Sequence, residues 1–120
     1  MKRYLVWGMV GLLLLAMTGI ASATVWQGTL DPGDYVTTPI SNVNDVQCKS
    51  KMTCMIPTLS PIPHQTWVTH GMSLEYLHSA DLMYNQTSYS SGSINYGTAT
   101  LHWRVGTAVS NGYSLFVFVW

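Results

Sequence analysis

Four histidines are the residues of this sequence best suited to bind a metal: His64, His70, His78 and His102. Five residues separate the first pair and seven the second, so the tight His-x3-His spacing is absent. No cluster of carboxylates lies beside them in the chain, which disfavours a metal site. Three of the histidines lie in or beside predicted turns, and His102 lies on the solvent side of a predicted strand. We therefore expect solvated or locally hydrogen-bonded histidines and no metal.

Catalytic residues are equally hard to assemble from this sequence. Serines are common, but none lies in a nucleophile-elbow motif. Acid catalysis needs two convergent carboxylates, and Glu75 and Asp81 are the only acids after residue 45. Nothing in the spacing of these two acids brings them together. The sequence thus predicts a protein that is not an enzyme and that carries no cofactor.

Cys48 and Cys54 are the two cysteines of the chain. Exported chains meet an oxidising compartment, so we expect these cysteines to pair in a disulfide. The closed ring would stabilise the fold by roughly 2 to 2.5 kcal/mol in the chain-entropy model. The bond would join strands 43–48 and 52–56 across a hairpin tip at residues 49–51. A redox or metal pair is the alternative, which the Cys-x5-Cys spacing disfavours.

Aromatic residues are numerous and offer the best candidate binding surface. A small domain cannot bury all of them, and tyrosine combines a large rigid ring with a hydrogen-bonding end. Those near predicted turns could therefore form a platform for a sugar or a protein partner. The candidate binding residues are Tyr84, Tyr89, Ser91 and Tyr96. The twelve aromatics after residue 23 are Trp26, Tyr35, Trp67, Tyr76, Tyr84, Tyr89, Tyr96, Trp103, Tyr113, Phe116, Phe118 and Trp120.

The segment Ser91-Gly-Ser-Ile-Asn-Tyr96 resembles the Ser-Gly-x-x-Tyr loop of bacterial periplasmic lysozyme inhibitors. The tyrosine comes one residue later here, and the resemblance covers six residues. That family consists of exported, disulfide-bearing β-barrels whose loop enters the lysozyme cleft. The resemblance implies that Ser91 and Tyr96 would contact the enzyme.

The elements that position these residues begin after an N-terminal leader. Lys2 and Arg3 precede an apolar run over residues 4–20, and Ala21-Ser-Ala23 supplies small residues for a signal peptidase. We expect a signal peptide over residues 1–23, cleaved after Ala23, and a secreted or periplasmic mature chain. A membrane anchor would need a longer apolar stretch and a stop-transfer charge. No stable membrane insertion is therefore expected after cleavage.

The mature part, residues 24–120, is expected to form one β-rich domain. It contains three basic residues and five acids, a formal charge of −2. Clustered Lys and Arg, on which nucleic-acid affinity depends, are missing. We expect no nucleic-acid partner.

Short β-branched and aromatic runs, cut by turn residues, predict an all-β fold. We expect a small Ig-like sandwich or closed barrel of seven to nine short antiparallel strands, with one short disulfide-closed loop. The stretch 71–84 is either strands or a helix. A strand leading to Arg104 must change face near Gly97, and a bulge at that glycine would achieve this.

The clearest pattern is at the C-terminus. Residues 98–105 alternate apolar and polar, with Trp103 on the apolar side, and residues 113–120 are apolar at almost every position. We expect these two strands to form a hairpin at the centre of the core. The last strand should be interior or covered by a second chain, so it could mediate homo-oligomerisation.

These patterns predict an exported, non-catalytic binding module. It would recognise a protein or glycan through aromatic and Ser-rich loops between Asp81 and Gly97. One alternative is a periplasmic inhibitor of a hydrolase, similar to the lysozyme inhibitors. Another is a self-assembling fimbrial or surface structural subunit.

Overall fold

The computed structural model describes residues 24–120, which form β-strands joined by turns and loops. The expected leader and its cleavage site after Ala23 lie outside the described residues. The strands are β1 (Val25–Leu30), β2 (Tyr35–Cys54), β3 (Ile62–His70), β4 (Ser73–Leu82), β5 (Thr87–Val105) and β6 (Ser114–Val119). All pairings between strands are antiparallel. The predicted all-β class is confirmed.

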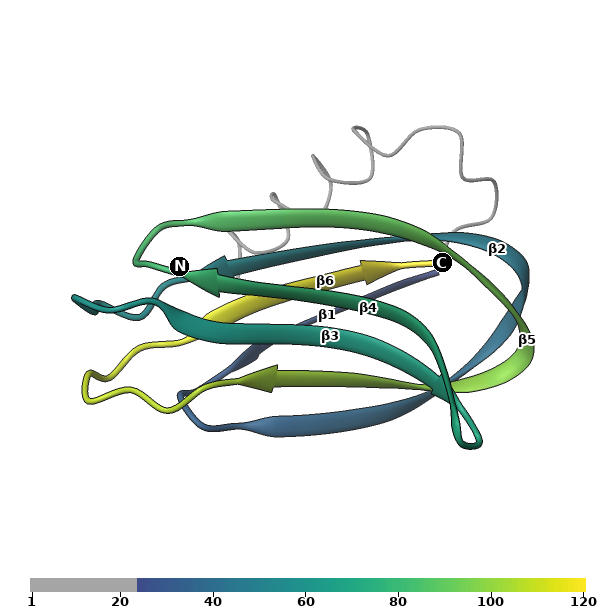
Figure 1. The fold of residues 1–120 in the computed structure, drawn as a ribbon, viewed down its shortest axis with the longest axis horizontal. Helices are drawn as coiled ribbons and strands as arrows, with labels where there is room; N and C mark the ends of the chain where they lie inside the picture. The colour runs from purple at the N-terminus through teal and green to yellow at the C-terminus, as the bar shows by residue number, and fades with distance from the viewer. Residues whose placement is uncertain (1–23) are drawn as a thin grey trace.

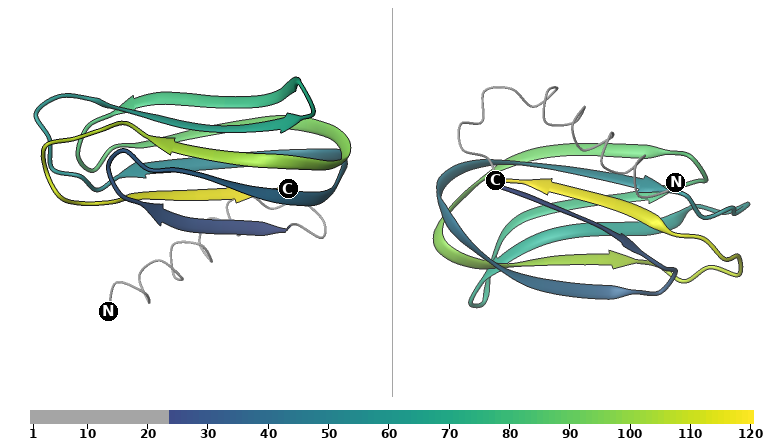
Figure 2. Two further views of the ribbon diagram at one scale, coloured as in Figure 1. Left: turned by 90° about the horizontal axis from the view of Figure 1, so that it is seen from below. Right: turned by 180° about the vertical axis from the view of Figure 1, so that it is seen from behind.

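The six strands form a continuous sheet in the order β1-β6-β2-β5-β3-β4. β2 and β5 pair with each other along most of their length, while β6 pairs with part of β2 and β3 pairs with part of β5. β6 pairs with residues 49–54 of β2, and β3 pairs with residues 100–105 of β5. The sheet therefore folds over into two layers, which Figures 1 and 2 show from three sides. The first layer holds β1, β6 and the adjoining halves of β2 and β5; the second layer holds their other halves, β3 and β4.

The bend between the layers is a bulge in β2. Between the pairs Val43–Tyr96 and Val46–Ile94, two residues of β2 lie opposite a single residue of β5. Asn42 and Asp45 adopt positive φ angles of 58° and 49°. Asn and Asp tolerate this left-handed conformation better than other non-glycine residues. β2 can therefore turn sharply without leaving the sheet.

β5 changes its inward face at the same place. Ile94 is buried on one parity, and Ala99, Leu101 and Trp103 are buried on the other. The predicted change of face near Gly97 is confirmed. The extra residue lies in the partner strand β2, and not at the glycine.

Large side chains from the two layers meet in the core. The rings of Trp26 and Trp103 stack with centroids 3.6 Å apart, and Tyr76 packs edge-on against Phe118. Trp103 is fully buried, as its place in the alternating pattern predicts. All six residues of β6 are buried, so the expectation of an interior last strand is also confirmed.

Several expectations about the strands are wrong. Six strands form instead of seven to nine, because β2 and β5 run for 20 and 19 residues through segments that read as separate strands and turns. The terminal hairpin does not form, since β6 lies between β1 and β2 and residues 106–113 cross between the layers. For the stretch 71–84, which the sequence leaves open between strands and a helix, the strand alternative holds: β4 alternates, with Tyr76, His78 and Leu82 buried. Residues 24–120 hold no helix that is long and apolar enough to cross a membrane.

The predicted disulfide is also wrong. Cys48 and Cys54 are free, buried thiols on the same strand, β2. Six residues of extended strand separate their Cα atoms by about 20 Å, whereas a disulfide needs less than about 7 Å. The Cys54 thiol instead donates to the Ile56 carbonyl at 3.7 Å. The expected hairpin failed because residues 49–51 continue the strand and pair with both β5 and β6.

Candidate functional site

The outer face of the second layer presents aromatic side chains from three neighbouring strands. In the sheet register Thr37 of β2 is opposite His102 of β5, which is opposite Trp67 of β3 and then Leu77 of β4. Residues in register point to the same side of a sheet. The inward neighbours, such as Trp103 and Thr66, are buried, so this row faces outward.

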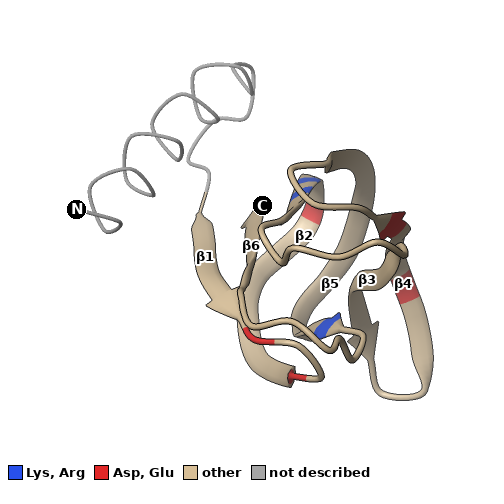
Figure 3. Cartoon of the chain, turned by 90° about the vertical axis from the view of Figure 1, so that its left-hand side faces the viewer, with Lys and Arg blue, Asp and Glu red and all other residues tan. Residues whose placement is uncertain are grey.

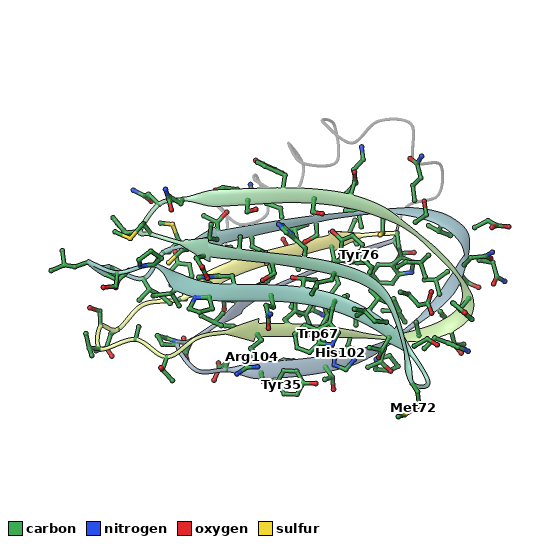
Figure 4. The ribbon with its side chains drawn as sticks, in the orientation of Figure 1. Tyr35, Trp67, Met72, Tyr76, His102 and Arg104 are labelled. Carbon is green, nitrogen blue, oxygen red and sulfur yellow. The ribbon has the colours of Figure 1, made fainter. Side chains whose placement is uncertain are left out.

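Three rings on this face are nearly parallel: those of Tyr35, Trp67 and His102, which we call the aromatic platform. Trp67 and His102 have centroids 4.8 Å apart and planes 3° apart. Tyr35 lies 5.6 Å from Trp67 and 6.0 Å from His102, with interplanar angles of 11° and 14°. The Tyr35 side chain is 54% exposed, and Trp67 and His102 are half-buried. The three labelled side chains lie together along one side of the molecule in Figure 4.

His102 is held in place at both ring nitrogens. Its Nδ1 is hydrogen-bonded to the Tyr35 hydroxyl at 2.7 Å, and its Nε2 to the Thr69 hydroxyl at 2.8 Å. A neutral imidazole has one donor and one acceptor nitrogen, so one hydroxyl donates and the other accepts. Burial lowers the pKa of His102 from its ordinary value, which favours this neutral ring. The platform is thus preorganised by its own hydrogen bonds.

A groove of about 570 Å³ adjoins the platform where β3 ends. Its walls carry the hydroxyls of Ser41, Thr69, Thr98 and Thr100. His70 also lines the groove, and its Nδ1 donates to the Thr98 carbonyl at 2.7 Å. The Nε2 of His70 has no hydrogen-bond partner among the described residues. Aromatic surface beside a few fixed polar groups is the usual composition of a small-molecule site.

The structure separates the four binding residues that the sequence suggested. Tyr96 stacks on His70 with centroids 4.1 Å apart, which places it beside the groove. Tyr89 and Ser91 lie exposed on the outer face of the first layer, opposite Lys51 and Lys49 in the register.

Tyr84 lies elsewhere again, exposed in the turn between β4 and β5. The segment 88–93, expected as a loop, is part of β5. Ser91 and Tyr96 are five residues apart in that strand, so they take opposite parities, and the loop of the lysozyme inhibitors has no counterpart here.

The platform residues Tyr35, Trp67 and His102 were missed as a group. Each lies in a predicted strand, and His102 was expected on a solvated face, which is where the structure places it. The feature that could have indicated the platform is an aromatic side chain at a solvent-facing position of a strand that alternates apolar and polar residues. Recognising it required the pairing of β3 with β5, which joins residues 35 positions apart.

Histidines were expected to be solvated or locally hydrogen-bonded, and two of the other three are buried and hydrogen-bonded. His64 Nδ1 donates to the Ile62 carbonyl, and its Nε2 accepts from the Ser114 hydroxyl at 2.7 Å. His78 is hydrogen-bonded to the Ser50 and Ser88 hydroxyls at 2.6 and 2.8 Å. Both histidines therefore join the two layers in the core. Among the described residues no group of three or more His, Cys, Asp or Glu side chains could hold a metal ion.

No family model and no curated protein matches this chain. A solved structure described as "CBM4 structure and function", a carbohydrate-binding module, is similar in fold. The TM-score is 0.50 at 12% sequence identity, over 83% of this chain and 76% of the other. At this identity the similarity shows the fold alone, a β-sandwich, which favours the sandwich over the closed barrel.

Proposed function

We propose that this chain is a non-catalytic module that binds a glycan on the aromatic platform. The observation that carries the proposal is the set of three near-parallel, partly exposed rings of Tyr35, Trp67 and His102. Apolar ring surface binds the C–H face of a pyranose, while nearby polar groups bind its hydroxyls. The similarity in fold to a carbohydrate-binding module is consistent with this role.

The groove provides the polar part of such a site. Two of its hydroxyls lie two residues from the platform along a strand: Thr100 is next to His102 on the outward side of β5, and Thr69 is next to Trp67 on β3. Successive outward residues of a strand are about 6.6 Å apart, so Thr100 and His102 are direct neighbours on the outer face of β5. A saccharide lying along β5 would therefore contact the rings and the groove hydroxyls at the same time.

The rigidity of the platform supports a binding role. Tyr35 and Thr69 fix the His102 ring, so little side-chain entropy is lost when a ligand covers it. Residues on regular strands also hold their positions better than residues on loops. The site needs no rearrangement to present its rings.

Affinity gel electrophoresis against a panel of soluble polysaccharides, followed by calorimetry on those that retard the protein, tests the proposal. Trp67→Ala should weaken binding at least about tenfold, because it removes the largest ring of the platform. Tyr89→Ala is the matched control, since Tyr89 is an exposed aromatic on the first layer. Equal binding by wild type and Trp67→Ala would contradict the proposal.

Export by a cleaved leader is proposed as part of this function. Its support is the N-terminal sequence alone. The intact mass of the protein recovered from culture medium or periplasm tests it, because cleavage after Ala23 leaves a chain that starts at Thr24.

A further inference from the structure

Arg104 is a cation without a partner at the edge of the aromatic platform. It is exposed, and its side chain forms no ion pair, hydrogen bond or ring contact with the other described residues. It is also the only arginine after residue 3. Charged residues are few in this chain, so an exposed arginine beside the platform is a candidate for a binding role.

The register places Arg104 inside the candidate site. Its neighbours across the sheet are Tyr35 on β2 and Gln65 on β3. Arg104 is two residues from His102 on the same strand, so both point outward. Figure 4 shows the Arg104 side chain next to Tyr35 and on the same side of the molecule as Trp67.

The charges around Arg104 leave its guanidinium available. Asp34 lies in the turn before β2, where one of its carboxylate oxygens accepts from the Asp31 backbone amide at 2.9 Å. Asp81 is two strands away, opposite Pro63 in the register. Figure 3 shows the Lys and Arg segments well apart, so Arg104 does not belong to a general basic field. Lys49 and Lys51 lie on the first layer.

Guanidinium chemistry indicates what this position can recognise. Arg presents several N–H donors in a planar fork, which matches the oxygens of a carboxylate or sulfate group. Tyr35 offers an exposed ring beside that fork, and Gln65 offers an amide on the other side. A ring for stacking and a group for anion binding are thus direct neighbours in the sheet register.

We infer that the glycan is anionic, and that Arg104 binds the carboxylate or sulfate of a sugar whose neighbour stacks on the platform. This inference rests on the proposed function. It names the ligand class and assigns Arg104 as a determinant of specificity. A charge-assisted hydrogen bond of this kind accounts for a preference of about tenfold or more over the neutral glycan.

Pairs of polysaccharides that differ only in charge test the inference. Polygalacturonate and its fully methyl-esterified form test carboxylate, and dextran sulfate and dextran test sulfate. The wild type should bind at least one acidic member about tenfold more tightly than its neutral partner. Arg104→Gln should abolish that preference, and Arg104→Lys should restore part of it, because lysine keeps the charge but loses the fork.

Lys51→Gln is the control for charge, because it removes one positive charge from the other layer. It should leave the preference unchanged. A preference that falls as much in Lys51→Gln as in Arg104→Gln would show nonspecific charge attraction and overturn the inference. The melting temperature of Arg104→Gln should match that of the wild type, since the side chain has no partners to lose.

The outcomes separate this inference from the proposed function. If Trp67→Ala loses binding to both members of a pair while the wild type binds them equally, glycan binding is upheld and the anionic preference is overturned. If Trp67→Ala binds as the wild type does, the platform is not the site and both fail. Absence of binding to every acidic polysaccharide, with retained binding to neutral ones, also overturns the inference alone.

Discussion

The hydroxyl of Tyr35 and Nδ1 of His102 are hydrogen-bonded at 2.7 Å across neighbouring strands, on the exposed face of the sheet. The bond joins two rings that also lie nearly parallel, at 14°. Thr69 completes the arrangement on the other side of the imidazole. The parallel, stacked arrangement of these rings thus depends on hydroxyl groups as much as on the rings themselves.

Replacing Tyr35 by Phe should expose this dependence. The variant keeps the ring but loses the hydrogen bond, so the free energy of unfolding should fall by about 1 kcal/mol. Glycan affinity should fall less than in Tyr35→Ala, which removes the ring as well. Urea denaturation and calorimetry measure the two effects. Identical affinities for Tyr35→Phe and Tyr35→Ala would show that the ring does not contact the ligand.

Gly92→Ala should destabilise the fold by about 1 to 3 kcal/mol, as overpacking of a core does. A Cβ atom at this position would lie 2.6 Å from Cδ2 of Tyr76, whose ring is held between the layers. Gly97→Ala is the matched control on the same strand, because its Cβ would meet only the Asn44 amide at 3.8 Å. Chemical denaturation of the pair should show a loss for the first substitution and little change for the second.

Trp103→Ala should cost about 3 to 5 kcal/mol, the usual loss for a buried large aromatic. The side chain is fully buried and stacks on Trp26 from the other layer. A domain of this size has a total stability of about 5 to 15 kcal/mol, so the variant should be largely unfolded or melt far below the wild type. A melting temperature within a few degrees of the wild type would contradict the packing described here.

Stability should fall as the pH drops below about 6.5. Burial lowers the pKa of His64 and of His78 from the ordinary value of 6.5. The unfolded chain then binds protons that the native state excludes, so the two buried histidines oppose folding in acid and have no such effect above pH 7. Urea midpoints at pH 7.5 and 5.5 should differ, and His78→Gln should reduce the difference. His70→Gln, a change on the surface, is the control.

The two cysteines should behave as protected free thiols. The intact mass should be the same with and without reductant, because the thiols lie too far apart to join. Burial raises the pKa of the Cys48 thiol to about 11, so little reactive thiolate forms at neutral pH. Iodoacetamide should therefore modify Cys48 in denaturant and hardly at all in the native protein. Rapid alkylation of native protein at both cysteines would contradict the burial.

The parts of the fold that sequence predicted correctly depend on local alternation. Trp103 on the buried side, the apolar last strand and the change of face near Gly97 each follow from the parity of neighbouring residues. The same parity places His102 on the solvent side. Alternation along the sequence predicts which side chains of these strands are buried, because one face of each strand packs in the core and the other is exposed.

The strand boundaries were predicted wrongly where the same local sequence is compatible with either a turn or a continuing strand. The segment 43–48 was expected to be a strand of its own, but Asn42 and Asp45 adopt positive φ angles that bend β2 and let it continue. Residues 49–51 look like a hairpin tip, but β6 and β5 on either side hold them extended. The aromatic platform could not be predicted because its residues meet only through pairings between β2, β5 and β3.

The bend in β2 and β5 also fixes how the outer faces of the two layers are oriented relative to each other. Both strands continue from one layer into the other, so the layers cannot hinge apart without breaking the longest ladder in the sheet. The platform lies on the outer face of one layer, and Lys51 and Tyr89 lie on the outer face of the other. The domain therefore holds its two outer faces rigidly on opposite sides of one core, so a chain bound on one face would keep a fixed orientation relative to whatever contacts the other face.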